Sequence, residues 1–219
     1  HGDVDAVPAD GAHAQADECQ RHQRVRGGQQ ADEEDRAEEA DPLEREQAVA
    51  LQQLDADASG VCLFAKREAL AIAWRRVLGD PHTELRWLTL VRSVAREQGR
   101  ITSPLREAGH DLDAATRYRR VEVLAGHALL DVTPETHRTH QIRRHLASIG
   151  AAVLGDDRYG HAASNRHLFE RHFLDRPFLH CASIELLHPR SGASLRIEAP
   201  LAPDLAAVVS RLRAVDAKP

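Results

Sequence analysis

The first 42 residues contain no Leu, Ile, Phe, Tyr or Trp, and this limits where the chain can build a hydrophobic core. A segment without large apolar side chains cannot bury enough surface to offset the entropy that it loses on ordering. We therefore expect residues 1–50 to be disordered, or to be an aberrant segment of the kind that a GC-rich coding region yields in a wrong reading frame. Residues 51–219 are predicted to form one folded domain.

Charge separates the same two segments. Of the 29 basic and 34 acidic residues in the chain, five arginines and 14 acidic residues lie in residues 1–50. Residues 51–219 therefore hold 24 basic and 20 acidic residues, a net charge of +4, whereas the whole chain carries −5. A mildly basic domain is compatible with RNA binding, although its net charge alone does not require it.

Cysteine usage and hydropathy indicate the compartment. Cys19, Cys62 and Cys181 form no CxxC pair, so neither a disulfide framework nor a zinc site is predicted. No apolar run approaches the roughly 18–20 residues of a membrane-spanning helix, and no signal pattern opens the sequence. We expect a cytoplasmic monomer without membrane association.

Short apolar runs and turn signals predict a mixed, mainly antiparallel sheet with flanking helices, an α+β fold. Strands are expected over residues 61–65 and 87–91, and hairpins over residues 117–133 and 178–198. Helices are expected over residues 66–78, 139–149 and 204–214. The first helix should bury Ala69, Ile72 or Ala73, and Val77, whereas the second should be capped by Thr139 and bury Ile142, Leu146 and Ile149.

Asp55 lies in the segment Leu54–Gly60, directly before the first apolar strand. A carboxylate in a turn before a buried strand is held by a rigid scaffold, yet it can face a cleft, which suits a nucleophile or an acid–base group. An Asx-type turn that satisfies backbone amides explains the same residues without catalysis. The segment alone does not choose between these readings.

Two neighbouring arginines, Arg143 and Arg144, follow Ile142 near the start of the second helix. Only one of them can point inward beside Ile142, where it could pair with a buried carboxylate and keep it ionised. A basic helix face in solvent is the alternative. The nearby histidines 137, 140 and 145 have no acidic or cysteine ligand at a useful spacing, so no metal site is predicted.

Four ordered segments resemble the motifs of the RluA-type RNA pseudouridine synthases. Residues 137–150 and 154–160 resemble the signature GRTHQIRxHLxxxGxPxxGDxxYG, and residues 179–189 resemble LHAxxLxxxHP. Residues 199–205 are similar to APLPxDL, and Leu54–Gly60 falls where the family has HRLDxxTSG. The resemblance extends from Leu54 to about Leu212.

The resemblance implies the pseudouridine synthase fold and the isomerisation of uridine to pseudouridine in rRNA or tRNA, without a cofactor. It makes Asp55 the catalytic nucleophile and Arg143 its basic partner. Trp87 stands where the family carries its active-site tyrosine. The substrate-binding residues are expected to be Trp87, Gln53, Arg138, His140, Gln141, Ile142 and Leu179, around a uridine flipped out of its stack.

The sequence also departs from the family's motifs. Gln52 and Gln53 replace the usual His-Arg pair, Ala58 replaces Thr, and His137 replaces Gly. The family's first strands, with their KPxG turn, are not recognisable in residues 1–50. A catalytically weak RNA-binding remnant is therefore the second hypothesis. A carboxylate-based hydrolase is disfavoured, because Asp57 is too close in sequence to face Asp55 across a substrate.

Overall fold

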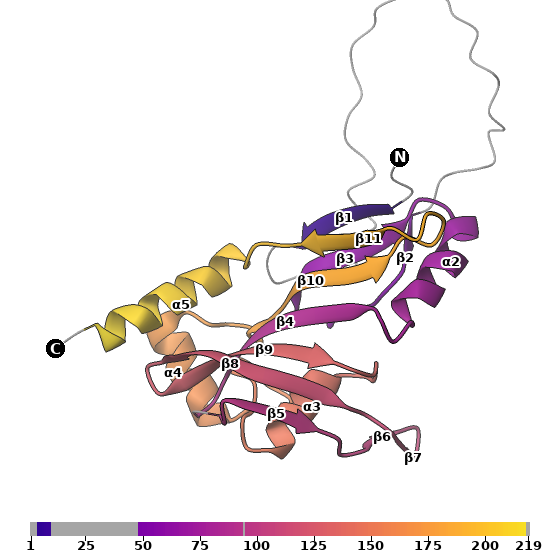
Figure 1. The fold of residues 1–219 in the computed structure, drawn as a ribbon. Helices are drawn as coiled ribbons and strands as arrows, with labels where there is room; N and C mark the ends of the chain where they lie inside the picture. Colours follow the sequence, from indigo (N-terminus) through magenta and orange to yellow (C-terminus); the bar gives the residue numbers. More distant parts are fainter. Residues whose placement is uncertain (1–3, 10–47, 94, 218–219) are drawn as a thin grey trace, which may run out of the picture.

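The computed structural model describes residues 4–9, 48–93 and 95–217 (Figure 1). Its strands are β1 (Val4–Ala9), β2 (Val49–Ala50), β3 (Ser59–Ala65), β4 (Glu84–Val91), β5 (Gln98–Ile101), β6 (Leu105–Glu107), β7 (His110–Leu112), β8 (Thr116–Leu124), β9 (His127–Pro134), β10 (Leu179–Leu187) and β11 (Ser194–Glu198). Its helices are α2 (Glu68–Leu78), α3 (Gln141–Ser148), α4 (Ala162–His172) and α5 (Pro203–Asp216).

In the described part of the chain, one nine-stranded sheet carries the fold, in the order β1-β3-β10-β4-β9-β8-β5. β11 adds to β10 and β2 to β3, whereas β6 and β7 form a separate hairpin. β3 and β10 run parallel and the other pairs are antiparallel. The predicted α+β class, with a mixed and mainly antiparallel sheet, is confirmed.

The turn chemistry of the sequence explains the predicted hairpins. Between β8 and β9, Ala125 and Gly126 both have positive φ, at 47° and 79°. Two such residues form the tight turn whose twist matches that of paired strands. The β6–β7 hairpin has the same kind of turn, because Ala108 and Gly109 also have positive φ. The sequence did not predict these two strands.

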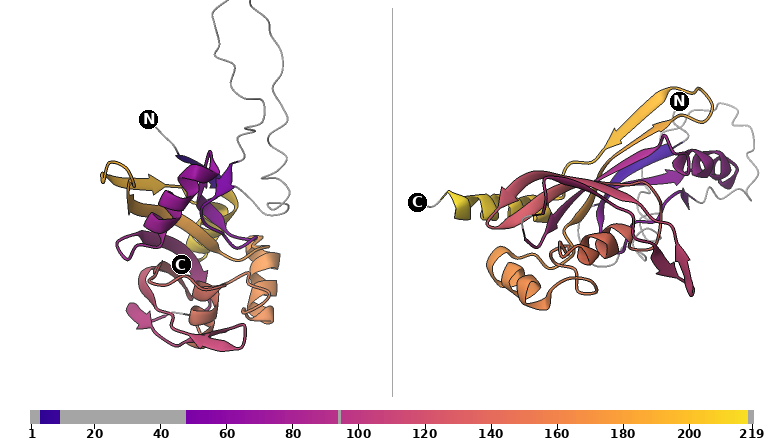
Figure 2. Two further views of the ribbon diagram at one scale, coloured as in Figure 1. Left: turned by 90° about the vertical axis from the view of Figure 1, so that its right-hand side faces the viewer. Right: turned by 60° about the horizontal axis from the view of Figure 1, so that its bottom comes forward.

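The helices surround the sheet in distinct places. α2 and α5 lie at opposite ends of the long dimension, and α3 and α4 lie on one side of the sheet (Figures 1 and 2). One buried cluster joins the sheet to α2 and α3, and includes Trp74, Trp87 and Leu146. A second cluster joins Leu90 and Leu129 of the sheet to α4 and α5. The core therefore continues on both sides of β4.

The predicted buried face of α2 is wrong. Ala71, Trp74 and Leu78 are buried, whereas Ile72 is 67% exposed. Ile72 lies on the helix face that carries Glu68, Arg75 and Arg76, and this charged face is the one turned to solvent. The opposite face packs inward. Its Trp74 ring lies in the core and meets the ring of His188 edge-on at 5.2 Å.

The second predicted helix, α3, starts later than expected. Thr139 does not cap it; its amide instead donates to Glu107 Oε1 at 2.7 Å. His140 is the N-cap residue, in the left-handed conformation with φ 51°. Ile142 and Leu146 are buried as predicted, but Ile149 is 45% exposed because the helix ends at Ser148.

Part of the N-terminal segment differs from the expected disorder. Val4–Ala9 forms β1, which pairs antiparallel with β3 from Val4 opposite Ala65 to Ala9 opposite Gly60. Backbone hydrogen bonds to an edge strand do not require large side chains, which is why composition did not reveal this strand. Val49 and Ala50 also pair with β3, so the sheet begins before the predicted boundary at residue 51. Residues 1–3 and 10–47 lie outside the described residues.

Two histidines between β9 and α4, His127 half-buried and His172 buried, predict a loss of stability in acid. Among the described residues, the Nδ1 atoms of His127 and His172 are buried without hydrogen-bond partners. Burial lowers the pKa of both imidazoles, and His167 lowers each further. Arg211 and Arg171 add to the effect at His172. Protonation is therefore less favourable in the folded state than in the unfolded state.

Because these folded-state pKa values lie below the unfolded value of about 6.5, their stability contribution is complete above that pH and is lost as the pH falls through the folded pKa. We expect the double variant His127→Gln/His172→Gln to flatten the fall in urea-unfolding free energy between about pH 7 and pH 5. His110→Gln, at an exposed position, is the control. An unchanged pH dependence in the double variant would show that other groups cause the acid loss.

Candidate active site

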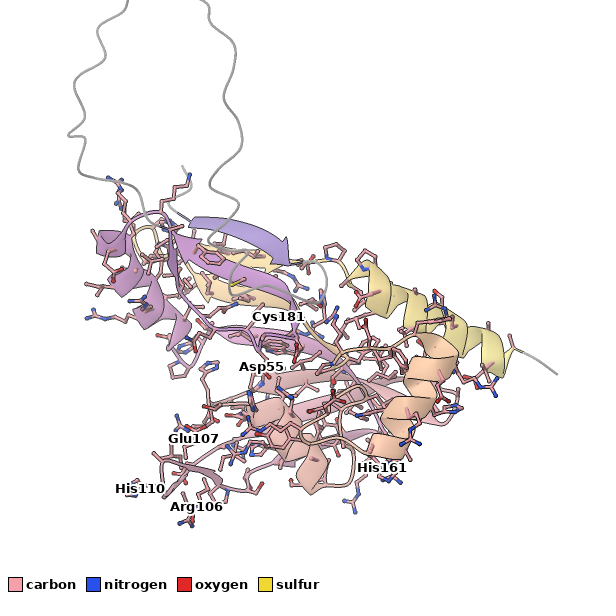
Figure 3. The ribbon with its side chains drawn as sticks, turned by 180° about the vertical axis from the view of Figure 1, so that it is seen from behind. Asp55, Arg106, Glu107, His110, His161 and Cys181 are labelled. Atoms are coloured by element: carbon pink, nitrogen blue, oxygen red, sulfur yellow. The ribbon has the colours of Figure 1, made fainter. Side chains whose placement is uncertain are left out.

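A cavity of about 750 Å³ opens where the segment before β3, the end of α2, β4 and the start of α3 meet. Figure 3 shows the labelled Asp55 near the middle of the molecule, on the side of the sheet where α3 lies. The lining residues are Ala50, Leu51, Gln52, Gln53, Leu54, Asp55, Ala56, Arg75, Leu78, Gly79, Leu85, Trp87, Pro134, Thr136, His137, Arg138, Thr139, His140, Gln141, Ile142, Arg143 and Leu179. This set includes every catalytic and substrate-binding residue expected from the sequence.

Asp55 opens a tight turn that leads into β3. The amide of Ala58 donates to the carbonyl oxygen of Asp55 at 2.8 Å, which closes the turn. The Asp55 side chain is 24% exposed and lines the cavity. The carboxylate is therefore fixed on a short turn just before a buried strand, yet remains open to a molecule in the cavity.

Arg143, in the first turn of α3, bridges two carboxylates. Its Nη1 atom donates to Asp55 Oδ2 at 3.0 Å, and its Nε and Nη2 atoms donate to the two oxygens of Asp156 at 2.7 and 2.8 Å. The guanidinium is only 7% exposed. Its hydrogen bonds to Asp156 above all, and then to Asp55, raise the pKa of Arg143 despite its burial, so the side chain stays charged.

Asp156 lies in the segment that resembles the family signature, but the sequence analysis gave it no role. Its carboxylate is fully buried and also accepts from the backbone amides of Arg158 and Tyr159, at 2.9 and 3.0 Å. Burial raises the pKa of this carboxyl, but the bonds from Arg143 and the two amides outweigh that effect and lower it. Asp156 thus holds the fork of Arg143 so that the remaining nitrogen, Nη1, reaches Asp55.

Tyr159 and His140 complete the surroundings of Arg143. The Arg143 guanidinium carbon lies 5.4 Å from the centroid of the Tyr159 ring, a distance typical of a cation–π contact. The Tyr159 hydroxyl is 3.1 Å from His140 Nδ1. Residues 154–160 resemble part of the family signature, but the motif alone does not show that this segment orients Arg143.

Apolar and polar groups line different parts of the cavity. Trp87, Ile142 and Leu179 are nearly buried, with exposed fractions of 8%, 6% and 3%. Among the described residues, the indole Nε1 atom of Trp87 is buried without a hydrogen-bond partner. Gln53 is exposed, and Arg138 donates to the carbonyl oxygens of Asp113 and His137. A flat ring with polar edges fits such a surface.

Gln141 is placed differently from the other expected substrate-binding residues. Its side chain is buried, and its amide nitrogen donates to Ala115 O and Thr116 Oγ1 at 2.9 and 3.0 Å. Its amide oxygen accepts from Thr136 Oγ1 at 2.7 Å. Both amide hydrogens are thus used inside the protein, and Gln141 supports the segment before α3 rather than offering hydrogen bonds to a substrate.

Arg144 does not compete with Arg143 for Asp55. Its Nη2 atom donates to the carbonyl oxygen of Arg106 at 3.0 Å, and its Nη1 atom lies 3.7 Å from Glu107 Oε1. Arg144 therefore faces the β6–β7 hairpin, whereas Arg143 faces the cavity. Within the described residues, no group of three or more His, Cys, Asp or Glu side chains could hold a metal ion, and no helix is long and apolar enough to cross a membrane.

Comparison with protein families identifies the chain. The family described as RNA pseudouridylate synthase matches residues 13–148, more than half of the sequence. The chain therefore belongs to the RNA pseudouridylate synthase family. This agrees with the resemblance that the sequence motifs indicated.

Curated relatives carry related names. An uncharacterized RNA pseudouridine synthase of Chloroflexus aurantiacus is 34% identical over 174 residues, which cover 73% of this chain and 52% of the relative. The ribosomal large subunit pseudouridine synthase C of Escherichia coli is 33% identical over 174 residues, 73% of this chain and 54% of that protein. The chain thus spans about half the length of the curated relatives it matches.

Solved structures share the fold. Human RNA pseudouridylate synthase domain containing 1 aligns with a TM-score of 0.62 at 22% identity, over 79% of this chain and 82% of that one. Human RNA pseudouridylate synthase domain containing 4 aligns with a TM-score of 0.63 at 18% identity, over 76% of each chain. At these identities the likeness establishes the architecture and not the substrate.

Proposed function

We propose that the chain isomerises uridine to pseudouridine within RNA, with Asp55 as the catalytic nucleophile. The observation that carries this proposal is the ion pair of Asp55 with the buried Arg143, at the wall of a cavity large enough for a flipped nucleotide. Membership of the family supports the same reaction.

The reaction moves one bond within the nucleotide. The N1–C1′ glycosidic bond breaks, the uracil turns, and C5 bonds to the same sugar carbon. C5 loses its proton and N1 gains one, so the isomerisation requires neither an oxidant nor a cofactor. Asp55 attacks the sugar carbon or removes a sugar proton, and in both routes its carboxylate must be ionised when the uridine arrives.

Arg143 supports that ionised state. Its guanidinium cannot lose its proton under ordinary conditions, and it donates directly to Asp55 Oδ2. A fixed positive charge beside a carboxylate favours the carboxylate form and holds its orientation. The remaining Asp55 oxygen, Oδ1, is then the one offered to the substrate.

The proposed substrate is ribosomal RNA of the large subunit, with tRNA as the alternative. Relatives named ribosomal large subunit pseudouridine synthase C and D, from Escherichia coli and Xanthomonas campestris, favour the first. The net charge of +4 in residues 51–219 is compatible with binding a phosphate backbone. We also propose that the protein acts as a monomer in the cytoplasm.

A catalytically weak RNA-binding protein is the second candidate function. Trp87 and Gln53 line the cavity where the family motif has a tyrosine and an arginine, and both changes could reduce turnover. Incubation of the purified chain with large-subunit rRNA and with tRNA, followed by mapping of pseudouridine, separates the two functions. RNA binding without any pseudouridine at stoichiometric protein would favour the second.

Trp87 offers a test of what the aromatic position contributes. An indole can stack on uracil but cannot carry a proton from C5, whereas a phenol can do both. We therefore expect Trp87→Tyr to raise single-turnover pseudouridine formation by about tenfold. Trp74→Tyr, the same change at the other tryptophan, should leave the rate unchanged. An equal or lower rate in Trp87→Tyr would remove proton transfer at this position from the mechanism.

A further inference from the structure

A second buried arginine, Arg176, lies behind the turn that carries Asp55. It precedes β10 and is 3% exposed. Its Nε and Nη2 atoms donate to the two carboxylate oxygens of Asp204, at 2.7 and 3.0 Å, at the start of α5. Its Nη1 atom donates to the backbone carbonyl of Asp57 at 3.1 Å, and Nη2 also donates to Ser59 Oγ at 3.2 Å. One side chain thus joins α5 to the Asp55 turn.

The network continues from Ser59 into β10. Ser59 Oγ lies 2.9 Å from His180 Nδ1, and His180 Nε2 lies 3.3 Å from the carbonyl oxygen of Ala199. Because a carbonyl can only accept, the proton belongs on Nε2, and Nδ1 accepts from the serine hydroxyl. Ser59 therefore accepts from Arg176 and donates to His180, so all of these bonds are compatible with one another.

The same turn is held sterically at its far end. Gly60 has φ 114°, and a Cβ atom there would lie 2.1 Å from the carbonyl oxygen of Cys181. Only glycine allows the two backbones to approach so closely. The strand that follows the turn is thereby fixed against β10 immediately after Ser59.

We propose that Arg176 is a positioning residue, which holds the Asp55–Ser59 backbone so that the Asp55 carboxylate meets both Arg143 and the flipped uridine. The turn has two points of attachment, one at a side chain and one at the backbone. Arg143 binds the Asp55 side chain, and Arg176 binds the carbonyl of Asp57, which precedes the residue whose amide closes the turn on Asp55 O. This inference rests on the proposed function, because it assigns Arg176 to the reaction of Asp55.

The chemistry of the contacts explains why the residue is an arginine. Three acceptors, namely Asp204, Asp57 O and Ser59 Oγ, lie in different directions around one planar group. A guanidinium can donate to all of them from a rigid fork, whereas a lysine ammonium is a point charge that cannot span the same set. Arg176→Lys should therefore keep the ion pair with Asp204 and release the turn.

The competing interpretation is that Arg176 only stabilises the packing of α5. Kinetic measurements separate this structural role from the positioning role. Loss of a purely stabilising contact lowers the free energy of unfolding and changes activity only by lowering the fraction of folded protein. Loss of positioning lowers the rate of the chemical step while RNA affinity stays the same, because the cavity lining in the described residues does not include Arg176. Small displacements of a reacting group can cost about a hundredfold in rate.

The experiment uses the full chain and compares Arg176→Lys with Arg120→Lys. Arg120 also donates to a loop carbonyl, Ala95 O at 2.7 Å, and serves as the matched control. The measurements are the single-turnover rate and the dissociation constant with the RNA that the wild type modifies, together with hydrogen exchange of the Ala58 amide.

For Arg176→Lys we expect a rate about a hundredfold lower, an unchanged dissociation constant, and faster exchange of the Ala58 amide. Arg120→Lys should match the wild type in all three. A folded Arg176→Lys protein with the wild-type rate and a protected Ala58 amide would overturn the proposal, as would a rate loss matched by an equal loss of RNA affinity.

Two further measurements test the proposal if Arg176→Lys does not fold or if the wild type is inactive. If Arg176→Lys does not fold, Ser59→Ala removes only the hydroxyl that Arg176 and His180 share, and its rate should fall by about fivefold; no fall would then overturn the proposal. If the wild type modifies neither rRNA nor tRNA, the proposed function fails. Hydrogen exchange at Ala58 still tests whether Arg176 holds the turn.

Discussion

Replacing Asp55 with asparagine is expected to lower pseudouridine formation by at least about a thousandfold while leaving the fold intact. An asparagine has the size of aspartate, and its amide oxygen can still accept from Arg143 Nη1, but it can neither attack a sugar carbon nor accept a proton effectively. Arg143 also keeps its bidentate pair with Asp156. Unfolding free energy should therefore change by no more than about 1 kcal/mol.

Asp57→Asn is the matched control for this variant. Asp57 lies in the same turn, its side chain is exposed, and its backbone carbonyl is the group that Arg176 binds. The substitution therefore removes one carboxylate two residues from Asp55 without removing that contact, and turnover should remain close to wild type. Retention of more than a few per cent of the wild-type rate by Asp55→Asn would exclude Asp55 as the nucleophile.

The meeting of Asp55 and Arg143 could be anticipated from the sequence, although 88 residues separate them. Helical periodicity put Ile142 on a buried face and allowed one neighbouring arginine to turn inward, and the motif resemblance chose Arg143. The buried face is thus local information in α3, whereas the pairing of Arg143 with Asp55 came from the resemblance. Side-chain patterns of this kind survive in a single sequence because they depend on residues three or four apart.

Asp156 and Arg176 could not be anticipated in the same way. Asp156 lies in the segment 154–160 that resembles the family signature, but the motif does not say that its carboxylate is buried against Arg143 of α3. Arg176 lies beside Pro177 in a connecting segment before β10. The importance of both residues depends on contacts across the sheet, and a sequence without an alignment carries no record of such contacts.

The errors in the predicted helices and strands also have physical causes. The predicted face of α2 placed Ile72 inward although Ile72 shares its side of the helix with Glu68 and Arg76, and the buried face is the opposite one, which carries Trp74. α4 was not expected because its sequence is rich in polar side chains and buries only Leu168 and His172 among its described residues. β1 forms through backbone pairing with β3, which composition cannot reveal.

The site thus combines a partly exposed reactive carboxylate with buried charged side chains that hold it in place. Asp55 is partly accessible, whereas Arg143, Asp156 and Arg176 are each less than a tenth exposed. Charged groups in such places are costly unless every one of them is paired, and here each has a partner of opposite charge. Removing one of these charged side chains should therefore lower the free energy of unfolding by more than the loss of its hydrogen bonds alone, because its partner is left as an unpaired buried charge.

Arg143→Ala is the variant in which this cost should be largest. It leaves the carboxylate of Asp156 fully buried with only the amides of Arg158 and Tyr159 as donors. Breaking a buried ion pair from one side typically destabilises a protein by about 3–5 kcal/mol. We expect a loss of that order in urea unfolding, together with loss of pseudouridine formation because Asp55 loses the charge that orients it.

A double variant separates the two effects. Arg143→Ala/Asp156→Ala removes the unpaired buried carboxylate, so it should recover stability relative to Arg143→Ala, whereas activity should stay lost because Asp55 still has no arginine beside it. Arg144→Ala is the control on the same helix; its side chain contacts the exposed β6–β7 hairpin, and its removal should weaken RNA binding with little change in stability. If the double variant recovered turnover along with stability, Arg143 would matter only for folding, and another group would have to keep the Asp55 carboxylate ionised.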